Sequence, residues 1–141
     1  MSNINAAIYT FDEQLFTELT PEEGAFIEGG ARLILYNATA IQARADGNWK
    51  DGNGDDLYIV VNGIRLPGTY NDVDTGESIN ISRTINFTGT ARVNLFDDDP
   101  SSSSADDYLG GFTVGDSRTG QKTVRVTKGG SIYDVLYKVI A

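Results

Sequence analysis

The sequence predicts an all-β fold, an eight-stranded antiparallel β-sandwich that follows a short helical N-terminal segment. Two observations support this prediction. Stretches in which apolar and polar residues alternate, as in half-buried strands, recur after residue 31 and are separated by turn-forming residues. The chain also carries 16 Gly and seven Tyr but only three Pro, a composition that favours a sheet protein with many turns. Its 141 residues suffice for one domain with its own hydrophobic core.

The alternating stretches place the eight strands at residues 32–41, 57–62, 64–70, 78–87, 90–96, 108–114, 121–127 and 132–140. Short turn signals at residues 62–63 and 88–89 and a loop at residues 115–120 fall at one end of the sandwich. Because successive antiparallel strands run in opposite directions, the long acidic connections are expected together at the other end. These connections are residues 43–56, 71–77 and 97–107.

Residues 1–30 differ in kind from the rest of the chain. They hold six acidic residues and no Lys or Arg, whereas the other 111 residues hold 14 acidic and 11 basic ones. Thr20 and Pro21 match the start of a helix, and Gly29 and Gly30 match a stop, so we expect two short helices at about 11–18 and 21–28. The chain thus divides into a helical segment, 1–30, and a sandwich domain, 31–141. A helical hairpin packed on the sheet is one interpretation of that segment.

A second interpretation comes from the spacing L-x3-E-x3-I-x-G-G near the end of this segment. It resembles the double-glycine leader of bacteriocins and related exported bacterial peptides. The resemblance implies a partner, an ABC transporter with its own peptidase domain, that cuts between Gly30 and Ala31 and releases a secreted protein from a cytoplasmic precursor. The residues that would be recognised or cut are Leu19, Glu23, Ile27, Gly29 and Gly30.

Acidic residues are concentrated in two of the long connections. The net charge of −9 argues against a nucleic-acid partner. Two carboxylates about 5 Å apart repel by roughly 3 kcal/mol at an effective dielectric constant of about 20. A hard cation such as Ca²⁺, which binds through oxygen ligands, would offset this repulsion, and a solvated acidic linker is the alternative. The clustered residues are Asp51, Asp55 and Asp56 in the first connection and Asp97, Asp98, Asp99, Asp106 and Asp107 in the third.

The residues at the borders of these connections resemble a known family. The run D-L-Y-I at residues 56–59 is similar to the D-P-Y-V that closes the first calcium loop of C2 domains, the calcium- and lipid-binding modules of protein kinase C and synaptotagmin. The run L-F-D-D-D at 95–99, followed by D-Y-L-G at 107–110, is similar to the third loop of that family. The resemblance covers about residues 32–115 and implies a C2-like sandwich.

Carried over by position, the resemblance implies that Asp56, Asp97, Asp99 and Asp107 are calcium ligands, with Asp51 as the early ligand of the first loop. The spacing of the first loop and the length of the third differ from those of the family, so Asp55, Asp98 and Asp106 are alternative ligands. Further candidates are Asp46, Asp72 and Asp74. Trp49, at the tip of the first connection, is a candidate for insertion into a membrane interface, and packing against the loop backbone is the alternative.

These observations predict a binding protein and not an enzyme. The chain has no Cys and no His, which excludes thiol nucleophiles, catalytic triads and disulfides. The expected function is that of an exported bacterial calcium-binding module, in which Ca²⁺ is structural or mediates docking to anionic lipid or another surface ligand. The alternatives are a bacteriocin-like secreted toxin and an intact intracellular calcium-binding protein with a helical N-terminal extension.

Overall fold

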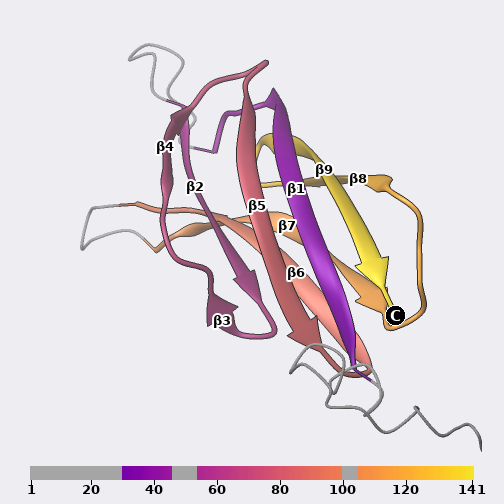
Figure 1. The fold of residues 1–141 in the computed structure, drawn as a ribbon. Helices are drawn as coiled ribbons and strands as arrows, with labels where there is room; N and C mark the ends of the chain where they lie inside the picture. Colours follow the sequence, from indigo (N-terminus) through magenta and orange to yellow (C-terminus); the bar gives the residue numbers. More distant parts are fainter. Residues whose placement is uncertain (1–29, 46–53, 100–104) are drawn as a thin grey trace, which may run out of the picture.

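The computed structural model describes residues 30–45, 54–99 and 105–141, which form two antiparallel β-sheets packed face to face (Figure 1). The predicted all-β sandwich is confirmed. The helices expected in the N-terminal segment, and the leader residues with them up to Gly29, lie outside the described residues. No helix in the described part of the chain is long and apolar enough to cross a membrane.

The first sheet has four strands in the order β5-β1-β9-β8, and the second has β3-β2-β6-β7 with β4 also paired to β2. The strands of the first sheet are β1 (Ala31–Gln42), β5 (Ser78–Phe87), β8 (Lys122–Lys128) and β9 (Ser131–Ile140). Those of the second are β2 (Asp55–Val61), β3 (Ile64–Arg65), β4 (Tyr70–Val73), β6 (Thr90–Asp97) and β7 (Asp107–Gly115).

One predicted strand, residues 64–70, is divided in the structure, so the described residues form nine strands where eight were expected. Its two parts are β3 and β4, and residues 66–69 between them belong to neither strand. Pro67 has no N–H to donate to a ladder, and Gly68 has a φ of 94°, which is outside the range of a strand. In the sequence, apolar residues still recur at Ile64, Leu66 and Tyr70 across this break, which is why the pattern was interpreted as one strand.

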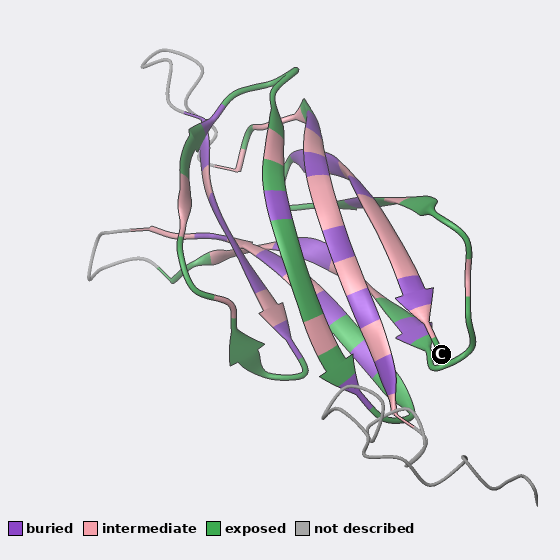
Figure 2. Ribbon diagram, viewed as in Figure 1, coloured by how far each residue is buried: buried purple, intermediate pink, exposed green. Residues whose placement is uncertain are grey.

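The core lies between the two sheets and follows the two-residue period of the strands. Leu33 and Leu35 of β1 are fully buried, as are Leu57 of β2 and Leu95 of β6 on the opposite sheet. Figure 2 shows the resulting bands of buried and partly exposed residues along β1. Burying each such leucine contributes about 1.5 to 3 kcal/mol, and this is what fixes the strand registers.

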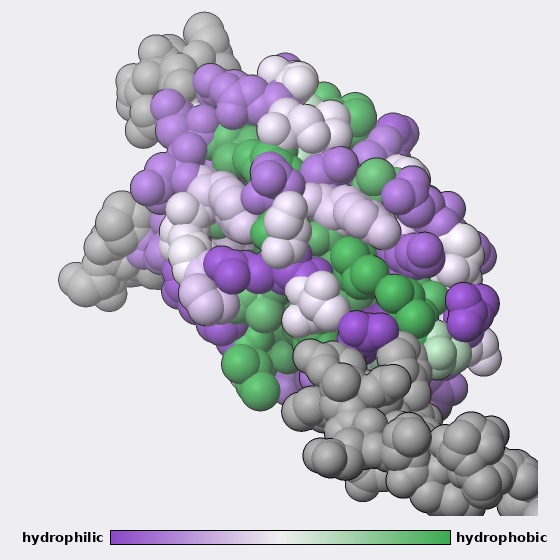
Figure 3. Space-filling view, viewed as in Figure 1, coloured by the Kyte–Doolittle hydropathy of each residue, from purple (hydrophilic) through white to green (hydrophobic). Residues whose placement is uncertain are grey.

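The strand registers bring the ends of the acidic connections together. Asp97, the last residue of β6, pairs with Leu57 near the start of β2 and with Asp107 at the start of β7. Val73, the last residue of β4, pairs with Asp55. The prediction that these connections share one pole is therefore confirmed for their described ends. Figure 3 shows hydrophilic side chains gathered around this pole, over β4.

Candidate functional site

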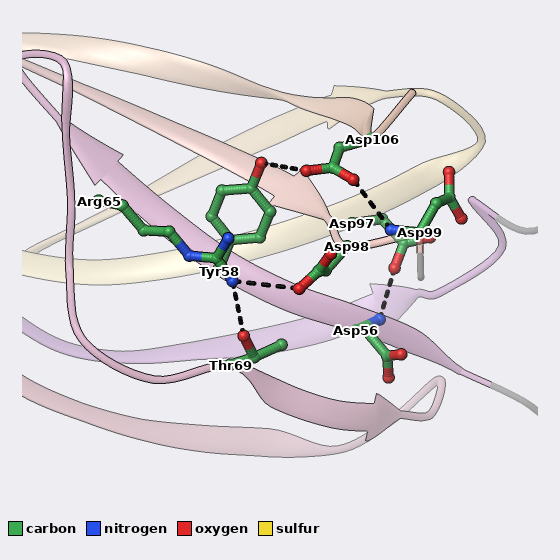
Figure 4. Close-up of polar contacts among 8 residues, drawn as sticks. All are labelled: Asp56, Tyr58, Arg65, Thr69, Asp97, Asp98, Asp99 and Asp106. Atoms are coloured by element: carbon green, nitrogen blue, oxygen red, sulfur yellow. Dashed lines mark hydrogen bonds and ion pairs between the residues drawn. The ribbon is translucent and has the colours of Figure 1, made fainter. Parts of the chain in front are cut away.

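The centre of the acidic pole is a contact between the first and third connections. The backbone N–H of Asp56 donates to Oδ1 of Asp97, and the N–H of Asp98 donates to the carbonyl oxygen of Asp56 at 2.8 Å. Figure 4 shows Asp97 reaching Asp56 across the two strands. Asp97 is only 1% exposed, so its carboxylate lies at the inner edge of the pole.

The second connection joins this pole through Asp72. Its N–H donates to Oδ1 of Asp56 at 2.7 Å, and its own Oδ1 accepts from the N–H of Gly54 at 2.7 Å. Asp72 has a φ of 55°, a left-handed conformation that Asp tolerates better than most residues. A Cβ atom at Gly54 would overlap the carbonyl oxygen of Val73, so the close approach of β2 to β4 requires glycine there.

Asp55 faces the interior and not the pole. It is fully buried, and its carboxylate accepts hydrogen bonds from the N–H of Ala45 at 2.9 Å, the hydroxyl of Ser131 at 2.6 Å and the hydroxyl of Tyr133 at 2.9 Å. Burial, and then the neighbouring charge of Asp55, raise the pKa of Tyr133, which therefore stays a hydrogen-bond donor. Asp55 thus ties the start of β2 to β9, and its oxygens already have protein partners.

Asp98 and Asp106 lie on the outer face of the second sheet. Oδ2 of Asp98 is 3.1 Å from a guanidinium nitrogen of Arg65. Oδ2 of Asp106 accepts from the hydroxyl of Tyr58 at 2.6 Å, and its Oδ1 accepts from the N–H of Asp99 at 3.0 Å. Burial first, and then the hydrogen bond to Asp106, raise the pKa of Tyr58 to about 12.

Asp107 is half-buried beside other carboxylates. Burial raises its pKa most, and the negative charges of Asp99, Asp55 and Asp106 raise it further, in that order. A raised pKa means that the ionised form of Asp107 is disfavoured in the folded chain. A cation bound between Asp107 and Asp99 would relieve this repulsion.

The remaining predicted residues either lie away from the centre of the pole or fall outside the described residues. Asp74 is exposed in a tight turn, where its carbonyl oxygen accepts from the N–H of Glu77 at 3.0 Å. Asp46, Trp49 and Asp51 lie outside the described residues. Within residues 30–45, 54–99 and 105–141, no three acidic side chains are grouped closely enough to hold a metal ion. The described carboxylates are therefore part of a cation site at most.

Comparison with known proteins shows which fold this is. No protein-family model matches the chain, and no curated protein sequence does. Among solved structures, one that contains two C2 domains of extended synaptotagmin 2 superposes with a TM-score of 0.51 at 17% identity, over 79% of this chain and 40% of its own. A second structure, described as a C2 domain, gives a TM-score of 0.51 at 14% identity, over 79% of this chain and 98% of its own. The sandwich has the C2 fold.

The C2 fold confirms the predicted fold, and at these identities the comparison establishes the fold alone. The chain spans 40% of the extended synaptotagmin 2 structure, with its two C2 domains. The double-glycine leader and the calcium ligands stay predictions. Within the C2 fold, four of the carboxylates that the loop motifs assign to calcium border the pole: Asp56, Asp97, Asp99 and Asp107.

The sequence analysis did not identify the side chains that contact Asp98 and Asp106. Tyr58 stacks on Phe96 with ring centroids 5.3 Å apart and ring planes 13° apart, and Phe96 lies 5.3 Å from Tyr108. The guanidinium of Arg65 lies 3.6 Å above the Tyr58 ring. The outward positions of Tyr58 and Phe96 on neighbouring strands were a signal for this aromatic face, but nothing in the sequence indicated that Arg65 would cap it.

Proposed function

We propose that this protein is an exported bacterial calcium-binding module with the C2 fold. In this proposal Asp56, Asp97, Asp99 and Asp107 provide carboxylate oxygens at the acidic pole, and Asp51 of the first connection completes the site. The observation that carries the proposal is the meeting of these strand ends at one pole, where Asp97 and Asp107 are paired directly across the β6–β7 ladder. The similarity of both loops to C2 calcium loops supports the same assignment.

The chemistry of these side chains fits Ca²⁺. Ca²⁺ takes about six to eight oxygen ligands in flexible geometries, and carboxylates supply both charge and coordination. Burial raises the pKa of Asp107 most, and repulsion by Asp99, Asp55 and Asp106 raises it further; a divalent cation would offset that repulsion. No three acidic side chains of the described residues are grouped closely enough to hold an ion, so the proposal requires these carboxylates to draw together around Ca²⁺ and takes a further ligand from the first connection, Asp51 or alternatively Asp46. Asp55 is left out of the ligand set, since both of its oxygens already accept hydrogen bonds.

Thermal unfolding of the full chain tests calcium binding directly. The protein is unfolded in EGTA and then in excess Ca²⁺, with Mg²⁺ at the same concentration as the control. A ligand present at 100 times its Kd stabilises the folded state by about 2.7 kcal/mol, which corresponds to a rise in Tm of roughly 10 °C for a domain of this size. The absence of any shift at calcium concentrations up to about 10 mM, well above the weakest extracellular sites, would overturn the proposal.

In this proposal bound Ca²⁺ either stabilises the loops or mediates docking to a surface. A structural ion would lock the loops once the protein reaches a calcium-rich exterior. A docking ion would bridge the pole to anionic lipid or another surface ligand, with Trp49 entering the interface. Sedimentation with vesicles of anionic lipid, with and without Ca²⁺, separates the cases. Docking predicts calcium-dependent binding that Trp49→Ala weakens, and a structural ion predicts calcium-dependent stability without vesicle binding.

Export is tested separately from calcium. Co-expression with a transporter of the double-glycine type should release a protein whose first residue is Ala31, as read by mass spectrometry of the medium. Gly30→Leu, which places a side chain at the cleavage position, should leave the precursor inside the cell. A chain that remains intact and intracellular with the wild-type sequence would instead identify an intracellular calcium-binding protein. Killing of neighbouring cells by the released protein would identify a bacteriocin-like toxin.

A further inference from the structure

Two residues outside the acidic pole, Tyr58 of β2 and Arg65 of β3, hold the two arms of the β6–β7 connection. Arg65 contacts Asp98, which precedes residues 100–104, and Tyr58 contacts Asp106, which follows them. Figure 4 shows these contacts side by side on the outer face of the second sheet. Asp98 and Asp106 therefore lie against this face, in contact with side chains that no calcium motif includes.

The alternation of side chains along an extended chain links these contacts to the pole. Along β6 successive side chains alternate between the core and the outer face, so Asp97 at its end faces inward, whereas Asp98, just beyond the strand, contacts Arg65. Asp97 is indeed buried, at 1% exposure, and Figure 4 shows the Asp99 carboxylate turned away from Arg65. On the other arm, Asp106, which contacts Tyr58, directly precedes Asp107 at the start of β7.

Both holding side chains are themselves fixed by several contacts. The Arg65 guanidinium donates to Oγ1 of Thr69 at 2.7 Å, contacts Asp98 at 3.1 Å and lies 3.6 Å above the Tyr58 ring. Tyr58 is 8% exposed, between Arg65 and the stacked ring of Phe96. The Arg65 side chain is 45% exposed but its guanidinium has three partners, and the Tyr58 ring is buried, so both side chains are restrained where they meet Asp98 and Asp106.

We propose that Arg65 and Tyr58 are positioning residues for the calcium site: by holding Asp98 and Asp106 on the outer face, they present Asp99 and Asp107 to the ion. This inference rests on the proposed function, since it assigns a role in calcium binding. Neither residue contacts the ion. Their role is that of the outer partners of metal ligands, whose loss usually lowers metal affinity about 10- to 100-fold.

Because Arg65 is positively charged, the direction in which its replacement changes calcium affinity distinguishes a positioning role from a purely electrostatic one. If Arg65 acted only as a nearby positive charge, its removal would lessen repulsion of Ca²⁺ and strengthen calcium binding. A positioning role predicts the opposite, because the released arm no longer presents Asp99. Arg65→Lys separates the two further, because it keeps the charge but loses the planar guanidinium that stacks on Tyr58.

The test is calorimetric titration of the full chain with Ca²⁺. Arg65→Gln and Tyr58→Phe should each weaken calcium binding about tenfold or more, and Arg65→Lys should weaken it as well. Two matched controls remove groups that bond to none of the carboxylates of the pole. Arg125→Gln removes a guanidinium that pairs with Asp134 on the other sheet, and Tyr108→Phe removes a hydroxyl that bonds to Asn94. Both controls should stay within about twofold of wild type. Unchanged or tighter binding in Arg65→Gln would overturn the inference.

A second readout needs no calcium and separates failure of this inference from failure of the proposed function. The amide of Asp99 donates to Asp106, which Tyr58 holds, so its hydrogen exchange in EGTA should be at least about threefold faster in Tyr58→Phe and unchanged in Tyr108→Phe. If wild type binds no calcium, the proposed function fails, and the exchange rates still decide whether Tyr58 orders this arm. If wild type binds calcium but the Asp99 amide exchanges equally in both variants, the positioning role is refuted.

Discussion

Replacing Asp55 tests whether this residue ties the two sheets together, as its contacts indicate. Its carboxylate accepts from Ala45, Ser131 and Tyr133, and these contacts bridge the start of β2 and the last strand, β9. Asp55, Ser131 and Tyr133 are all fully buried, so no water can replace a lost partner without rearrangement. Asp55→Ala removes all three contacts and leaves two buried hydroxyls and one amide without this acceptor.

The expected loss follows from the number and kind of these bonds. A hydrogen bond to a charged acceptor contributes about 1.5 kcal/mol or more, and part of that gain is offset because the alanine no longer buries a charge. The three bonds together predict a loss of about 3 to 5 kcal/mol in the free energy of unfolding. For a domain of this size the corresponding fall in Tm is roughly 12 to 20 °C. Domains of this kind are stable by only about 5 to 15 kcal/mol, so the change is large.

Asp55→Asn is the matched comparison. The amide keeps one oxygen for the Ala45 N–H, and its NH₂ can donate to the two hydroxyls, because a hydroxyl accepts as well as donates. The expected loss is therefore smaller, about 1 to 2 kcal/mol. Urea unfolding of wild type and both variants in EGTA measures these differences. A loss below about 1 kcal/mol for Asp55→Ala would refute the structural role, and loss of the calcium response in an otherwise stable Asp55→Asn would return Asp55 to the ligand set.

Three further predictions address the pole and its supports. Asp107→Asn should raise Tm by a few degrees at pH 7 in EGTA and abolish the calcium-induced rise in Tm. The pKa of Asp107 is raised above 3.8 in the folded chain, so between pH 3.8 and the raised pKa the folded chain binds more protons than the unfolded one. The free energy of unfolding therefore falls as the pH rises through this range, and the neutral Asn avoids that loss. A lower Tm in EGTA would contradict this. Asp106→Asn should lower the pKa of Tyr58 from about 12 but leave it above 10, because burial, the largest cause of the shift, remains; phenolate absorbance measures this, and an unchanged titration would contradict the contact. Gly54→Ala should cost more than about 2 kcal/mol in urea unfolding, whereas Gly120→Ala, which has open space around it, should stay within about 0.5 kcal/mol.

The strands and the shared pole could be predicted from sequence because both depend on local patterns. Alternation of apolar residues marks the inward face, and short turn signals fix which connections share an end. The same alternation carried information about Asp55 that distinguishes it from Asp56. Leu57 and Ile59 face the core, so Asp55, two residues before Leu57, faces it as well, whereas Asp56 faces outward.

The supports of the acidic pole could not be predicted because they join residues far apart in the chain. Arg65 and Asp98 are 33 positions apart, and Tyr58 and Asp106 are 48 positions apart. Their meeting depends on the pairing of β2 with β3 and β6 and on the break after β3, which alternation alone does not show. A count of clustered carboxylates treats Asp98 and Asp99 alike, although the structure directs them to different sides.

The central claim, that Ca²⁺ binds at the acidic pole, is tested most directly by following backbone amide signals of the full chain by NMR during calcium titration. The account predicts saturable shifts concentrated at residues 54–57, 97–99 and 106–108, with little change at the opposite pole around residues 62–63 and 115–121. Saturable shifts centred on that opposite pole, or no shifts at all, would contradict it.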